Sequence, residues 1–210
     1  MVSERACRSM ERMQYLKKIY MFFFVFLLAV VLGCAPEIGV RLVVPDVPDA
    51  VSLEDSARTG NRLRVHVGAF KDNRIDTTLV TIDGRKVESD GSVGSSVQEG
   101  FVRYLSRAGA SAAILGAPTI EGEITQWHAE VNPSFPTSRA SSVAKLAILI
   151  RDSRGHSIYR ATFTGESLVE HPMLGEKEVS RLLGKSMGSA IEAVVRDEEI
   201  MRQLTRGNIK

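Results

Sequence analysis

The segment KDNRID, residues 71–76, is the densest group of polar side chains in the sequence. It follows a predicted strand, and loops at strand ends often hold binding residues. Asp and Asn also stabilise turns by hydrogen bonding to their own backbone, and Arg74 can form an ion pair with Asp72 or Asp76. We therefore expect a structural loop, with an interaction site at Asp72, Arg74 and Asp76 as the alternative.

Other residues that could act on a ligand lie on predicted strands. His66 and His128 could meet on adjacent strands and bind zinc, although two solvent-facing positions explain them more simply. Glu121 and Glu123 share one strand face, but the sequence assigns them no acid–base partner and no pocket. The only tryptophan, Trp127, suits either contact with a protein from an exposed sheet face or packing in the core.

The sequence predicts a protein without catalytic residues. The glycine–serine turn GSVGSS, residues 91–96, lacks the flanking residues of a nucleophile elbow or a phosphate-binding loop. No two of the four histidines are separated by the few residues that are typical of metal-binding motifs. These histidines are His66, His128, His156 and His171. We therefore expect no enzyme activity, no metal and no diffusible cofactor.

A long apolar run ends abruptly in Gly33 and Cys34. Two lysines precede the run, and the order of positive, apolar and small residues is that of a secretory signal peptide. The alternative is a membrane-spanning helix over residues 19–36, which just reaches the minimum length of about 17 residues for a span. Pro36 directly after the run, and a cysteine that no helix requires, favour a signal peptide that is removed.

The sequence VLGC, residues 31–34, resembles the lipobox of bacterial lipoproteins. The resemblance implies that the Cys34 thiol receives diacylglycerol and that the chain is cut between Gly33 and Cys34. The freed amino group would then receive a further acyl chain. Ala35, in place of an aspartate, implies a lipid anchor in the periplasmic leaflet of the outer membrane, with the inner membrane as the alternative.

Charge and length describe one globular domain behind this segment. Residues 1–33 carry five basic and two acidic side chains, whereas the remainder carries 22 basic and 23 acidic ones. Such a balance creates no field that would collect phosphates, so we exclude nucleic acid as a partner. We expect a signal peptide over 1–33, a lipidated tether over 34–60 with a possible strand at 38–44, and a periplasmic domain over 61–206.

Hydrophobic periodicity predicts the elements of this domain. Alternation indicates strands over 62–70 and 119–131, a hairpin around Asp83-Gly84, and two strands within 141–170. In the strand 119–131, the faces are expected to carry Ile120 and Ile124 on one side and Trp127 and Val131 on the other. One helix is predicted to begin at a capping box formed by Ser96 and Glu99, or by Ser95 and Gln98. A second, amphipathic helix is predicted over 176–204.

The element order β–α–β–β–β–α, with antiparallel hairpins, predicts an α+β fold of two layers. We expect one mostly antiparallel sheet with two amphipathic helices on a single face.

From about residue 63 to 204, the chain resembles the YajG-type lipoproteins of Gram-negative bacteria. The likeness rests on the LGC of the lipobox, on D-x-R-x-D at Asp72, Arg74 and Asp76, and on the following VTIDG. That family is described as outer-membrane lipoproteins without an assigned activity, so the resemblance implies location and fold. We expect an envelope adaptor or binding module whose partner is an envelope protein. The alternatives are an auxiliary lipoprotein of a transport system that binds a lipid or glycan, and a cell-wall enzyme.

Overall fold

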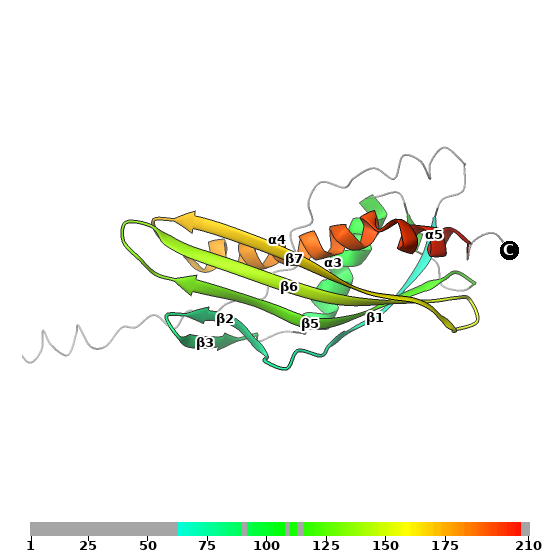
Figure 1. The fold of residues 1–210 in the computed structure, drawn as a ribbon, viewed down its shortest axis with the longest axis horizontal. Helices are drawn as coiled ribbons and strands as arrows, with labels where there is room; N and C mark the ends of the chain where they lie inside the picture. The colour runs from blue at the N-terminus through cyan, green and yellow to red at the C-terminus, as the bar shows by residue number, and fades with distance from the viewer. Residues whose placement is uncertain (1–62, 90–91, 108–109, 113–115, 207–210) are drawn as a thin grey trace, which may run out of the picture. The chain divides into compact units, whose positions relative to one another are not determined.

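The computed structural model describes residues 63–89, 92–107, 110–112 and 116–206 (Figure 1). The predicted signal peptide, the cleavage site at Gly33 and Cys34, and the tether with its possible strand at 38–44 lie outside these residues. The described part is an α+β structure in which one mixed sheet carries helices on one face. The elements are β1 Arg64–Asp72, β2 Thr78–Ile82, β3 Arg85–Glu88, α3 Val93–Arg107, β4 Ser111–Ala112, β5 Thr119–Asn132, β6 Ser138–Arg151, β7 Ser157–His171, α4 Glu176–Arg196 and α5 Glu198–Arg206.

Strand β5 is the centre of the sheet. On one side it pairs with β6, which pairs in turn with β7, and both of these long ladders are antiparallel. On the other side β1 and β2 lie one after the other along β5, and both run parallel to it. The short strands β3 and β4 pair with β2 and β1 from outside. The predicted α+β class is confirmed, and the parallel pairings are an addition that hairpin signals do not reveal.

The helices cover one face of the sheet and enclose the core with it. Helix α3 packs on β1, and α4 packs on β5, β6 and β7. Glycines allow close approaches between helices and strands: a Cβ on Gly94 would lie 2.2 Å from the carbonyl oxygen of Phe70, and a Cβ on Gly165 would lie 2.0 Å from that of Ser186. The opposite face of the sheet, called the open face below, carries no described helix (Figure 1).

The predicted C-terminal helix is two helices. Asp197 has an extended backbone, with φ −71° and ψ 116°, and separates α4 from α5. Its Oδ1 accepts a hydrogen bond of 2.8 Å from the backbone N–H of Ile200, the usual role of an aspartate at the start of a helix. The expectation of two helices therefore missed this break, because the apolar period continues across it.

Helix α3 begins earlier than either predicted capping box. Its first residue is Val93, and the hydroxyl of Ser92 accepts a hydrogen bond of 3.4 Å from the backbone N–H of Ser95. Both predicted capping residues, Ser95 and Ser96, therefore lie within the first turn of the helix.

Irregularities in two strands decide which side chains enter the core. The β5–β6 register shifts between Ile124 and Gln126, so that Thr125 is an extra residue and the alternation reverses after it. Trp127 and Val131 consequently share the buried face with Ile120 and Ile124, and the prediction of opposite faces is wrong. A similar shift between Val67 and Phe70 turns Phe70 into the core.

Candidate functional site

The KDNRID loop joins β1 to β2 next to the irregularity of β5. Its backbone continues the pairing, since the N–H of Asn73 donates to the carbonyl of Ile124 at 3.0 Å. The side chain of Arg74 is only 3% exposed, and its Nη1 donates to the carbonyl of Trp127 at 3.1 Å. The guanidinium thus supplies a donor to β5 where β1 has ended and β2 has not yet begun.

The two aspartates of this loop are acceptors within the protein. Arg74 donates to both oxygens of Asp72, at 2.8 and 2.9 Å, and these hydrogen bonds hold the pKa of Asp72 below its usual value. Asp76 accepts from the backbone N–H of Thr78 and from the ammonium of Lys86, each at 2.9 Å. A hydrogen bond from the Thr78 side chain lowers the pKa of Asp76 most, followed by those from Lys86 and from the Thr78 backbone. The Asp and Arg side chains of the D-x-R-x-D sequence therefore stabilise the loop and connect it to β5.

The indole of Trp127 is part of the core. Its side chain is 1% exposed, and Nε1 donates to the carbonyl of Leu183 in α4 at 3.1 Å. Of the two interpretations of this residue, core packing is the one that the structure supports. An exposed tryptophan on the open face is excluded.

The strand register does not bring His66 and His128 together. His66 on β1 lies opposite Thr119, at the beginning of β5, whereas His128 lies near the other end of β5 and contacts Thr81 on β2 at 3.2 Å. Within the described ranges, no group of three or more His, Cys, Asp or Glu side chains is placed to hold a metal ion. The possibility of a His66–His128 pair is therefore wrong, because the strand register separates the two rings.

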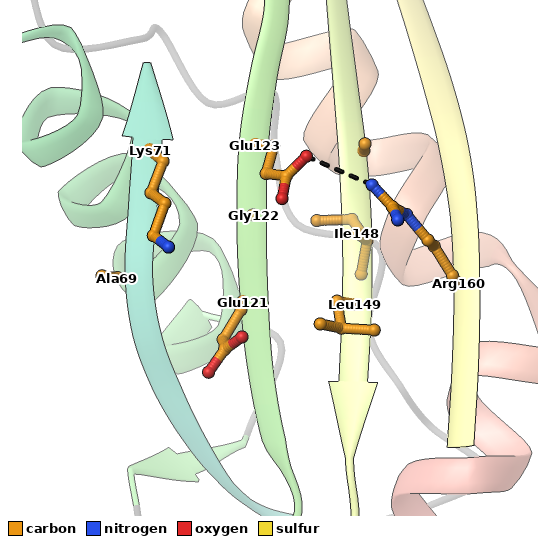
Figure 2. Close-up of a pocket in the computed structure, with 9 residues that line it drawn as sticks. Ala69, Lys71, Glu121, Gly122, Glu123, Ile148, Leu149 and Arg160 are labelled. Atoms are coloured by element: carbon orange, nitrogen blue, oxygen red, sulfur yellow. Dashed lines mark hydrogen bonds and ion pairs between the residues drawn. The ribbon is translucent and has the colours of Figure 1, made fainter. Parts of the chain in front are cut away.

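A shallow hollow of about 90 Å³ lies on the open face, between β1 and β7 (Figure 2). Glu121 and Glu123 on β5 line it together with Lys71 on β1 and Arg160 on β7. Its floor is formed by the small or apolar side chains of Ala69, Ala147 and Leu149. The sequence placed the two glutamates on one face but gave no sign of the hollow.

Arginines on β6 and β7 form ion pairs with both glutamates of the hollow. Arg160 donates to Glu123 at 3.2 Å, as the dashed line in Figure 2 shows, and Arg151 donates to Glu121 at 3.1 Å. These partners are 37 and 30 residues away in the sequence, so only the sheet register brings them together. Small-molecule pockets usually measure about 300–1,000 Å³. The hollow is therefore suited to polar contact with another surface rather than to enclosing a substrate.

Several apolar side chains that the sequence analysis did not select are exposed. Two lie on the edge strand β7, Ile158 and Leu168, which are 37% and 61% exposed. The others lie in loops: Ile75, Phe135 and Met173. An apolar residue at a solvent-facing position of an alternating strand was the available signal for Ile158 and Leu168.

In the described residues, no helix combines the length and the apolar character needed to cross a membrane. Solved structures resemble the chain at low sequence identity. A DUF330 protein from Xanthomonas campestris is 13% identical, with a TM-score of 0.54 over 77% of this chain and 96% of that chain. A minor lipoprotein from Acinetobacter baumannii is 9% identical, with a TM-score of 0.42 over 68% of this chain and 95% of the other. The lipoprotein GNA1162 from Neisseria meningitidis is 12% identical, with a TM-score of 0.33 over 65% and 100%. The first of these supports the fold.

A search of proteins with curated descriptions finds no match. The model of an uncharacterised lipoprotein family matches residues 51–205, which includes nearly all of the described structure. Because this match covers well over half of the sequence, the chain belongs to that family of uncharacterised lipoproteins.

Proposed function

We propose that the protein is lipidated at Cys34 and anchored in the periplasmic leaflet of the outer membrane, where residues 61–206 act as a non-catalytic adaptor for an envelope protein. The observation that carries the anchor is the sequence VLGC ahead of a domain that belongs to a lipoprotein family. The likeness to YajG-type lipoproteins supports the same location. Two or more acyl chains are what stable anchoring requires, since one chain binds a membrane only marginally.

The open face supports a protein partner. Its charged side chains have both signs and are arranged in ion pairs across strands, including Arg139 with Glu170 at 2.5 Å, Arg151 with Glu121 and Arg160 with Glu123. Exposed charges of both signs favour an oriented contact with a complementary surface. The hollow of about 90 Å³ and its charged walls give no comparable support to a bound lipid.

The anchor is tested by labelling cells with radioactive palmitate after the substitution Cys34→Ala. Label and cleavage between Gly33 and Cys34 are both expected to disappear. The matched control is Cys7→Ala, which removes the other cysteine of the chain and should leave labelling unchanged. Incorporation of palmitate into the Cys34→Ala protein would contradict the proposed lipidation.

The adaptor role is tested separately by photo-crosslinking in intact cells. A photoreactive residue at Lys145, exposed on the open face of β6, should capture one envelope protein. Lys185, exposed on α4, is the matched control because it replaces the same side chain on the helical layer. The adaptor proposal fails if neither position captures a protein, or if both positions capture the same proteins to the same extent.

A further inference from the structure

Strand β7 is a long edge of the sheet. All of its fifteen residues except Ile158, which lies at a register shift, pair with β6, and no described strand pairs with its other side. The opposite edge is formed by β3 and β4, which have four and two residues. Short strands, lysines, prolines and bulges are the usual protection against edge pairing. Strand β7 has no lysine and no proline, and its pairing with β6 is regular from Tyr159 to His171.

The open-face side chains of β7 are arranged symmetrically about Phe163. Threonines stand at Thr162 and Thr164, immediately before and after it. Further out, the basic Arg160 matches the acidic Glu166, and beyond these the exposed apolar Ile158 matches Leu168, the two apolar side chains of this strand that are most accessible. A strand with this order is complementary to an antiparallel copy of itself.

We propose that two copies of this chain pair through β7 in antiparallel fashion, with Phe163 on the two-fold axis. In this register Ile158 lies opposite Leu168 of the second copy, Arg160 opposite Glu166, and Thr162 opposite Thr164. Each contact occurs twice because the interface is isologous. Apolar, oppositely charged and Thr–Thr pairs are the cross-strand combinations that stabilise antiparallel strands.

The neighbouring registers that keep the same faces aligned are less favourable. With Thr164 on the axis, Arg160 would lie opposite Leu168 and Ile158 opposite Glu170. With Thr162 on the axis, Ile158 would lie opposite Glu166. Both registers place apolar side chains against charges, so the pattern of this strand selects Phe163 as the centre.

The helical face of β7 carries Ala161, Phe163 and Gly165. In the proposed register the two Phe163 side chains meet on this face, and on either side of them Gly165 of one copy lies opposite Ala161 of the other. Helix α4 packs on β6 as well as β7, and it lies close to β7 at Gly165, where a Cβ would be 2.0 Å from the carbonyl oxygen of Ser186.

The first experiment measures the dissociation constant of the full-length protein in detergent by sedimentation equilibrium. The wild type is expected to be a dimer. Glu166→Arg, and separately Arg160→Glu, would set like charges opposite each other twice and weaken dimerisation roughly tenfold or more. The double variant Arg160→Glu with Glu166→Arg restores opposite charges and should recover most of the affinity. Glu130→Arg is the matched control, since Glu130 is exposed on β5 away from this edge, and should have no effect.

The second experiment tests the register in membranes. Two differently tagged copies are expressed together, one carrying Thr162→Cys and the other Thr164→Cys, and are oxidised. Directly opposed positions should form a mixed disulfide, whereas Thr162→Cys with Glu166→Cys are diagonal and should form several-fold less. A monomeric wild type, preference for the second combination, or no disulfide in either would overturn the proposal. If residues 34–62 of the same chain occupy this edge in place of a second copy, the wild type should be monomeric and neither cysteine combination should form a disulfide.

Discussion

The substitution Arg74→Met removes the guanidinium that connects the KDNRID loop to β5. Methionine retains much of the length and apolar stem of arginine but donates no hydrogen bond. The change leaves the carboxylate of Asp72 without the arginine and leaves the carbonyl of Trp127 without its donor. We expect the sheet to lose stability at the junction of β1 and β2.

The size of the loss follows from the burial of the groups left behind. Removing one partner of a buried ion pair costs about 3–5 kcal/mol, but Asp72 is 31% exposed, so water replaces part of what the arginine gave. An unsatisfied buried carbonyl costs about 1–3 kcal/mol. Because water can solvate the exposed part of Asp72, the cost of losing its ion pair is smaller than for a fully buried pair. We therefore expect Arg74→Met to lower the free energy of unfolding by about 2–4 kcal/mol.

The assay is urea unfolding of the purified protein, followed by the fluorescence of the single buried tryptophan, Trp127. Arg74→Lys keeps the charge but not the paired donors and should lie between the wild type and Arg74→Met. The matched control is Arg181→Met, an exposed position on α4, where the change should stay within about 0.5 kcal/mol.

The reasoning would be refuted if Arg74→Met cost less than about 1 kcal/mol. It would also be refuted if Arg74→Met and Asp72→Asn were additive in the double variant. Two residues that share hydrogen bonds should instead show a coupling energy of about 0.5–3 kcal/mol.

Three further predictions concern stability. Gly165→Ala should cost more than about 2 kcal/mol, because the new Cβ meets backbone atoms of α4 at 2.0 and 2.4 Å; an unchanged thermal midpoint would contradict this. Asp197→Ala should cost about 0.5–2 kcal/mol and expose amides at the start of α5 to faster hydrogen exchange, since the capping bond to Ile200 is lost; unchanged exchange would contradict it. Asp72 has a folded pKa below its usual 3.8, so its contribution is complete above that pH and is lost as the pH falls through the folded pKa. The stability difference between wild type and Asp72→Asn should therefore shrink below about pH 4, and a constant difference would contradict the pKa direction.

Glycine and aspartate variants need their own controls. Gly175→Ala meets only the carboxylate of Glu178 at 3.0 Å, the end of a flexible side chain, and should cost less than Gly165→Ala. Asp83→Asn lies in the exposed β2–β3 turn, where asparagine also accepts a positive φ, so its effect should be small.

Local patterns in the sequence were sufficient for the fold class. Alternating apolar residues predicted β5, β6 and β7, and the helical period predicted α3 and the stretch of α4 and α5. The Asp83-Gly84 turn and the antiparallel hairpins followed from turn chemistry that acts over a few residues. Helix boundaries were less accurate, since the break at Asp197 interrupts the backbone without interrupting the apolar period.

What the sequence determined by itself is most of the strands and helices in their order along the chain, the two-layer α+β class, and the lipobox-like VLGC that motivates the proposed anchor. Only the tertiary structure decided that Trp127 enters the core, that Arg74 reaches its carbonyl, and that Arg160 meets Glu123. The physical reason is the separation in the sequence between the residues that interact. Periodicity and turns act between near neighbours, whereas one extra residue in β5 reverses every side chain after it, and the contacts of the site join residues that only strand register brings together.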